Sequence, residues 1–363
     1  MKYALIITML SIAASVAYGQ TTSRIDFETY NPTSSLVVPQ HVVTRAKFPF
    51  IDIHNHQNDM SPQALGTLVK VMDTLNMAVM VNLSGSFGER LKQFSSSIKV
   101  NFPKRFVVFA NINFSGIGEN NWTQKAVKQL ENDVRNGAAG LKIFETLGLS
   151  VKDNQGRRVA VDDERLDAIW SKCAELKIPV LIHTAAPKQF WQPLNNNNER
   201  LLELITRPDR KRSDTYPAPW QQLIDEQHRM FKKHSSTTFI AAHFGWHAND
   251  LEKLGQMLDD MKNVVVEFGA VIAELGRQPI TANQFFTKYQ DRILFGKDSW
   301  VPEEYTTYFK VLETKDEYFP YHKKYHAFWA MYGIGLPDEI LKKVYYKNAL
   351  RLLPSIDKSR FPL

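Results

Sequence analysis

Two histidines, His54 and His56, flank a single asparagine at the end of the apolar run 50–53. In a β-strand, residues two positions apart point to the same face, so both imidazoles leave the strand end side by side. Two imidazoles in this arrangement suit neighbouring ligand positions of one divalent metal ion. An isolated His-x-His is equally compatible with one buried and one surface histidine. The rest of the chain must therefore decide between these interpretations.

Four more residues that could ligate a metal or transfer a proton stand at the ends of other apolar runs. They are Lys142, His183, His243 and Asp298. A single buried histidine is most simply a satisfied core residue. Such residues at five different strand ends, counting His54 and His56 as one, are hard to obtain from core packing alone. The pattern predicts that they converge on one site.

Eight apolar runs alternate with stretches that carry apolar residues at helical spacing. The runs are 50–53, 78–83, 106–112, 140–144, 180–183, 238–242, 264–268 and 293–295, and the helical stretches include 124–136, 163–176 and 248–261. Near-continuous apolar strands separated by helices indicate a parallel sheet covered by helices. Eight such units predict an α/β fold, a (β/α)8 TIM barrel with its site at the C-terminal ends of the strands. A doubly wound open sheet is the alternative.

The first 19 residues are predicted to be a cleaved signal peptide. Lys2 makes the start positive, 4–12 is apolar, and the sequence AYG at 17–19 resembles a small-x-small cleavage site. An N-terminal anchor helix is the alternative, but this apolar stretch is short for a membrane span. We therefore expect a periplasmic or secreted protein with no stable membrane insertion. Its only cysteine, Cys173, can form no intramolecular disulfide.

The chain of 363 residues is 44% hydrophobic and can bury a large core. We predict an extended N-terminal arm at 20–47, a barrel with a C-terminal helix at 48–354, and a tail at 355–363. The net charge of +7 is dispersed along the sequence. The longest basic patch, 207–212, lacks interleaved aromatic residues, so we interpret it as a solvated loop and expect no nucleic-acid partner.

Several motifs together resemble the amidohydrolase superfamily, and within it the amidohydrolase-related branch that includes aminocarboxymuconate-semialdehyde decarboxylase-like proteins. They are IDIHNH at 51–56, VLIH at 180–183, AAHFG at 241–245, LFGKDS at 294–299 and NALRLL at 348–353. The last motif resembles the family's closing helix, which packs on the barrel. The resemblance spans roughly 48–353 and implies a metal-dependent enzyme with a small-molecule substrate. A homodimer is common among such proteins, and the sequence leaves the oligomeric state open.

The resemblance also implies roles for the residues at the strand ends. His54, His56, His183 and Asp298 would hold the metal, and Asp298 would also accept a proton from the activated water. His243 would ligate a second metal, or bind the substrate and its developing oxyanion. Zinc is the expected ion, with manganese as an alternative.

Lys142 has three interpretations. In binuclear members of the superfamily, a lysine at the end of strand four is carboxylated and bridges two metals, and GLKIF at 140–144 offers Lys142 in that place. Alternatively, the side chain reaches solvent or pairs with Glu145. In the interpretation that we favour, the site holds one metal and Lys142 contacts the substrate.

The long segment 185–220 is predicted to form a lid over the site. Its aromatic residues are Phe190, Trp191, Tyr216 and Trp220. Trp246 follows His243 and Trp300 follows Asp298, so we expect Trp191, Trp246 and Trp300 to contact the substrate together with Lys142. An aromatic or carbohydrate-like ring would suit such a lining, and the general positive charge of the chain favours an anionic substrate.

Two reactions use nearly the same residues. One is hydrolysis of an ester, lactone or amide carbonyl, and the other is non-oxidative decarboxylation of a small carboxylic acid. Export favours hydrolysis, so we predict a metal-dependent hydrolase with a carboxy-lyase as the alternative. A catalytically inactive exported binding protein is a second alternative.

Overall fold

The computed structural model describes residues 30, 32–213 and 215–362. The predicted signal peptide at 1–19 lies outside these residues, as does the first part of the predicted arm. The chain divides into two compact units, 1–38 and 39–363. No helix or strand occurs in the described part of the first unit. Among the described residues, no helix is both long and apolar enough to cross a membrane.

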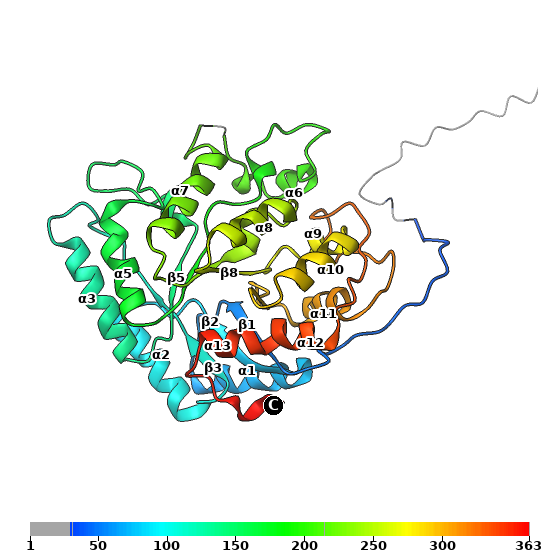
Figure 1. The fold of residues 1–363 in the computed structure, drawn as a ribbon, viewed down its shortest axis with the longest axis horizontal. Helices are drawn as coiled ribbons and strands as arrows, with labels where there is room; N and C mark the ends of the chain where they lie inside the picture. The colour runs from blue at the N-terminus through cyan, green and yellow to red at the C-terminus, as the bar shows by residue number, and fades with distance from the viewer. Residues whose placement is uncertain (1–29, 31, 214, 363) are drawn as a thin grey trace, which may run out of the picture. The chain divides into compact units, whose positions relative to one another are not determined.

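Short parallel strands form the centre of the second unit (Figure 1). Their bounds are β1 Phe50–Asn55, β2 Met77–Asn82, β3 Phe106–Val108, β4 Ala110–Asn111, β5 Leu141–Ile143, β6 Val180–Ile182, β7 Phe239–Ala241, β8 Val264–Glu267 and β9 Ile293–Leu294. One ladder joins β1 to β3 and another joins β4 to β9, each in sequence order. Only Phe109 separates β3 from β4, so the apolar run predicted at 106–112 forms one strand shared by the two ladders.

Backbone hydrogen bonds join the last strand to the first. Ile53 N donates to Phe295 O at 2.9 Å, and Asp298 N donates to His54 O at 2.7 Å. A parallel bridge also pairs Asn55 with Asp298. The strand order never reverses, as it would in a doubly wound sheet. The predicted TIM barrel is therefore confirmed, and the open-sheet alternative is excluded.

Helices follow most strands and cover the sheet (Figure 1). Their bounds are α1 Pro62–Leu75, α2 Gly88–Asn101, α3 Trp122–Arg135, α4 Thr146–Leu149, α5 Asp167–Glu175, α6 Leu201–Thr206, α7 Trp220–Lys233, α8 Leu251–Asp260, α9 Ile272–Gly276, α10 Pro279–Lys288, α11 Tyr305–Glu313, α12 Asp338–Lys342 and α13 Asn348–Leu352. The helical stretches predicted at 124–136, 163–176 and 248–261 correspond to α3, α5 and α8. Local chemistry sets several helix starts: Ser61 Oγ caps α1 before Pro62, and Asp250 caps α8.

The C-terminal helix α13 clamps the last strand, as the NALRLL motif predicted. Asn348 Nδ2 donates to Ile293 O at 2.8 Å and to Gln290 O at 2.7 Å. In the helical turn before α13, Val344 O accepts a hydrogen bond from Phe295 N at 3.1 Å, which adds a second contact with the end of the last strand. Beyond α13, Phe361 is buried and stacks on Tyr346 with ring centroids 5.2 Å apart. The segment predicted as a tail is thus docked on the barrel.

Phe50 should be a main contributor to stability where the barrel closes. Its ring is fully buried, 4.8 Å from Phe295 and 5.3 Å from Phe309, so it links β1 to β9 and α11. We expect Phe50→Ala to lower the free energy of unfolding by about 3–5 kcal/mol, because the cavity would not refill. Phe328→Ala, at a side chain that is 71% exposed, should cost less than about 1 kcal/mol. Urea denaturation of both variants measures this difference, and similar costs would contradict it.

Candidate metal centre and active site

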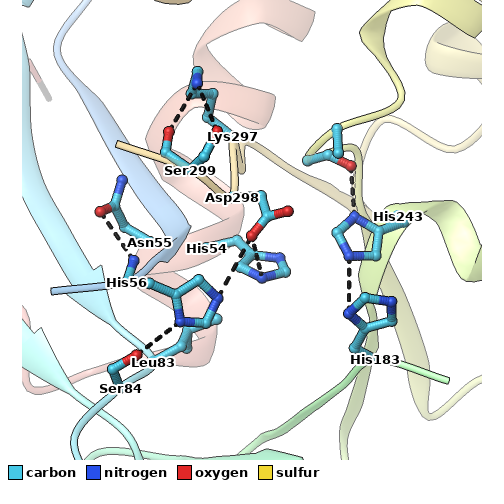
Figure 2. Close-up of polar contacts among 12 residues, drawn as sticks. His54, Asn55, His56, Leu83, Ser84, His183, His243, Lys297, Asp298 and Ser299 are labelled. Atoms are coloured by element: carbon cyan, nitrogen blue, oxygen red, sulfur yellow. Dashed lines mark hydrogen bonds and ion pairs between the residues drawn. The ribbon is translucent and has the colours of Figure 1, made fainter. Parts of the chain in front are cut away.

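His54 and His56 leave the C-terminal end of β1 close together, and Asp298 faces both of them (Figure 2). The imidazole centroids are 5.2 Å apart. Asp298 Oδ1 lies 3.4 Å from His54 Nε2 and 3.5 Å from His56 Nε2. The turn that carries Asp298 is fixed by Lys297, whose Nζ donates to Ser299 O at 2.8 Å. Two predicted ligands from β1 and one from beyond β9 therefore meet at a single point.

The hydrogen bonds of His54 set its tautomer. Its Nδ1 lies 2.9 Å from Glu267 Oε1, and Glu267 accepts backbone hydrogen bonds through both oxygens, so we assign the imidazole proton to Nδ1. Burial holds the pKa of His54 far below its usual value and lowers that of His56 to about 4, so both rings are neutral near pH 7. His54 Nε2 thus presents a lone pair to a carboxylate oxygen 3.4 Å away.

This juxtaposition is electrostatically unfavourable unless a cation lies between the atoms. Burial alone would raise the pKa of Asp298, but the neighbouring His54 and His243 hold it below its usual value, so the carboxylate is charged. His56 Nδ1 is held at 2.9 Å from Ser84 Oγ, which leaves its Nε2 to point at Asp298. Partners on the far ring nitrogen are typical of histidines that ligate metals. These three side chains therefore fit a divalent ion.

Glu267 is the residue that the sequence interpretation missed. It ends β8, is fully buried, and accepts hydrogen bonds from His243 N at 2.8 Å and Gly269 N at 2.6 Å besides contacting His54. Gly296 permits its approach, because a Cβ there would lie 2.2 Å from Glu267 Oε2. The sequence did contain a signal for Glu267. It is an acidic residue near the end of the apolar run 264–268, just as the predicted site residues stand at the ends of the other apolar runs.

His243 and His183 form the other side of the site (Figure 2). The chain turns sharply after β7, with left-handed backbone angles from His243 to Trp246. His243 Nδ1 lies 2.6 Å from Gly269 O, and its Nε2 lies 3.3 Å from His183 Nδ1. In the described part of the chain, His183 joins none of the groups in which three ligand atoms lie mutually close. The structure places it next to His243, and its role as a ligand stays a prediction.

Lys142 lies in the middle of β5 and is buried. Its Nζ has no hydrogen-bond partner among the residues that the structure describes, and it sits 5.4 Å from the Phe144 ring centroid. Burial lowers the pKa of Lys142 to about 8, although Asp298 and Glu267 oppose this effect. The interpretation that Lys142 reaches solvent is therefore wrong. A buried ammonium without a partner favours an anionic ligand or a carboxylated lysine.

A cavity of about 290 Å³ is lined by His183, His243 and Asp298. Trp246 lines it, with its ring 4.6 Å from that of His243, and so does Phe190 from the segment predicted as a lid. The structure places Trp191 and Trp300 outside this wall. The Trp191 indole donates to Ala218 O at 2.9 Å within a separate apolar cluster, and Trp300 packs against Tyr305. Residue periodicity could not distinguish these packing tryptophans from Trp246.

The chain belongs to the amidohydrolase family, because the family model described as Amidohydrolase matches residues 104–355, more than half of its length. This match confirms the resemblance predicted from the motifs, although it begins after His54 and His56. Members of the family are metal-dependent enzymes, among them hydrolases and decarboxylases. No curated protein matches the chain.

Solved structures show the same fold at low sequence identity. A 2,6-dihydroxybenzoate decarboxylase in complex with 2,6-dihydroxybenzoate is 13% identical, with a TM-score of 0.54 over 85% of this chain and 99% of the other. An uncharacterized TIM-barrel protein from Bordetella bronchiseptica is 15% identical, with a TM-score of 0.53 over 85% and 99%. A 4-oxalomesaconate hydratase from Rhodopseudomonas palustris is 14% identical, with a TM-score of 0.50 over 85% and 97%.

Replacement of Glu267 by glutamine should weaken metal binding without removing a ligand. Glu267→Gln keeps the size of the side chain but loses the charge that orients His54 through Nδ1. Outer partners of this kind typically change metal affinity by about 10–100-fold. Competition with a chelating dye measures the zinc dissociation constant, and Gln290→Glu, at a partly exposed side chain that donates to Thr287 O, is a control. An unchanged zinc affinity would contradict this role.

Proposed function

We propose that the protein is a metal-dependent hydrolase that attacks the ester, lactone or amide carbonyl of a small anionic or aromatic molecule. The observation that carries the proposal is the convergence of two neutral imidazoles, through Nε2, on one oxygen of Asp298. A bound divalent ion would supply a Lewis acid that polarises the carbonyl and lowers the pKa of water. Zinc is our first choice and manganese the alternative.

Each residue of the site has a separate proposed role. His54, His56 and Asp298 would hold the ion, with His183 proposed as a further ligand. Asp298 accepts the proton of the attacking water and passes it to the leaving group, a role that suits a carboxylate kept ionised in a buried site. Because His243 Nδ1 faces Gly269 O, a neutral His243 offers a lone pair at Nε2. It can then accept a proton from the substrate or ligate a second ion.

Decarboxylation is the second candidate, favoured by Lys142. Its buried ammonium, which has no hydrogen-bond partner among the described residues, lies beside the site and is suited to bind a carboxylate. In this reaction the bond from carbon to the carboxylate breaks, CO2 leaves, and the carbon keeps the electron pair and takes a proton from an acid of the site. The likeness in fold to a 2,6-dihydroxybenzoate decarboxylase supports a test of this reaction.

We also propose that the protein is exported and matures at Gln20, so that it works in the periplasm or outside the cell. The positive start, the apolar stretch at 4–12 and the sequence at 17–19 support this proposal. Hydrolysis of external material would suit such a location.

Metal content is the first test of the function. We expect about one zinc or manganese ion per chain in protein that begins at Gln20 and was purified without chelator, and none in a His54→Ala/His56→Ala double variant. His41→Ala, at a side chain that is 66% exposed, is the control and should keep the ion. Elemental analysis gives the stoichiometry. The metal-loaded protein is then screened with lactones, esters and aromatic acids, with product analysis to separate carbonyl hydrolysis from release of CO2.

Other stoichiometries have definite meanings. Two ions per chain would assign a carboxylated bridge to Lys142 and a binuclear hydrolysis. If the protein binds no ion after reconstitution with zinc and manganese, the proposed function is contradicted. Tight binding of organic acids by such a metal-free protein, without turnover, would favour the exported binding protein instead.

Binding of a simple carboxylate should report the charge on Lys142. With a pKa of about 8, this lysine is charged below pH 8 and loses its charge above it. Benzoate should therefore bind the zinc-loaded protein about tenfold more weakly at pH 9 than at pH 7, since only the charged form attracts the carboxylate. In Lys142→Met, this part of the pH dependence should disappear while the metal content stays the same. Calorimetric titration measures it, and identical pH profiles would contradict a contact with the ligand.

A further inference from the structure

The wall of the cavity carries more positive charge than hydrolysis or decarboxylation requires. Its cationic residues, besides the histidines, are Arg200, Arg210, Arg212 and Lys323. Three of them are already paired with carboxylates. Glu274 accepts a hydrogen bond from Arg200 at 2.8 Å, Glu203 accepts one from Arg210 at 2.5 Å, and Lys323 Nζ lies 3.7 Å from Glu304. These three cations therefore already have anionic partners within the protein.

Arg212 differs from the other three. Its backbone N donates to Phe190 O at 2.9 Å, which fixes it to a residue of the cavity wall. Its Nη1 donates only to the backbone oxygens of Asp209, at 2.7 Å, and Lys211, at 3.2 Å. No carboxylate in the described ranges 32–213 and 215–362 forms an ion pair with its guanidinium. Its Nε and Nη2 are therefore available, and a guanidinium is well suited to bind a carboxylate through two parallel hydrogen bonds.

The charge of Arg212 acts on the histidine side of the site. Burial raises the pKa of Glu145, and the nearby Arg212 lowers it. Glu145 Oε2 in turn lies 3.5 Å from His183 Nε2. Asp298 lines the same cavity, so one occupant can reach both Arg212 and the candidate metal ligands. With a volume of about 290 Å³, the cavity is at the small end of the range for ligand sites.

We propose that Arg212 binds a carboxylate of the substrate that lies away from the reacting bond, so that the site takes small organic acids with a second carboxylate. This inference rests on the proposed function and names the substrate class of the same site. It also corrects the interpretation of 207–212 as a solvated loop, because Arg210 and Arg212 both line the cavity. The segment after β6 therefore contributes charge to the site in addition to the ring of Phe190.

The test compares acids with one and two carboxylates. Phthalate, isophthalate and terephthalate are compared with benzoate by calorimetric titration into the zinc-loaded protein that begins at Gln20. We expect at least one of the three to bind about tenfold more tightly than benzoate, the gain typical of one charge-assisted contact. Arg212→Met should abolish the preference, and Arg212→Lys, which keeps the charge without the fork, should retain part of it. Arg207→Met is the matched control.

Arg207 lies on the same segment and is exposed, pairs with Asp209 at 3.1 Å, and is absent from the cavity wall. Its removal changes the net charge equally, so the preference for two carboxylates should survive. Equal preferences in Arg212→Met and the unaltered chain would overturn the proposal, as would equal losses in both methionine variants. Thermal unfolding verifies that each variant is folded.

Metal analysis of every variant separates this inference from the proposed function. We expect the same ion content in all of them, because Arg212 is not a proposed ligand. If the chain binds no metal but still prefers acids with two carboxylates in an Arg212-dependent way, the carboxylate contact is supported and the proposed metal-dependent function is contradicted. A metal-loaded chain with no preference for two carboxylates would overturn the Arg212 proposal and leave the metal site standing.

Discussion

The hydrogen bond from Asp298 N to His54 O is the contact on which the arrangement of the site depends. It joins the end of the last strand to the end of the first, and these are the two places that supply the candidate ligands around Asp298. Asp52 supports the same junction between the first and last strands. It accepts hydrogen bonds from His54 N and Lys297 N, both at 3.1 Å. Burial raises the pKa of Asp52 to about 6, despite these bonds and that from Tyr305. The contacts that close the barrel are therefore the same contacts that position His54 and Asp298.

Glu267 ties the two halves of the site together. One buried carboxylate contacts His54 from β1, the backbone of His243 after β7, and Gly269 after its own strand. These contacts require close approach of three strand ends, which the missing side chain of Gly296 allows. Because Glu267 holds the orientation of the candidate ligand His54, it limits the geometry with which a metal ion could bind there. Lys142 Nζ, in contrast, has no hydrogen-bond partner in the described part of the chain.

The sequence predicted the strands and the residues at their ends because both follow from periodicity and from the geometry of parallel barrels. His54, His56, His243 and Asp298 meet as their positions indicated. The loops were less predictable. Trp191 and Trp246 each follow a histidine at a strand end, but a left-handed turn places Trp246 at the cavity, whereas the Trp191 indole donates to Ala218 O. Arg212 reaches the wall through a backbone contact with Phe190 that no residue pattern encodes.

The hydrogen bond from Asn348 to Ile293 has a consequence for when the candidate metal site is completed. A chain is synthesised from its N-terminus, so His54 and His56 emerge long before the strand and the helix that complete the junction between the first and last strands. Before α13 packs on the last strand, Asp298 is not held beside His54 and His56. The two imidazoles then supply only part of the candidate coordination shell. A cation bound at that stage would have only two neutral ligands. The complete candidate metal site therefore exists only in the finished barrel, after the last α-helix has docked.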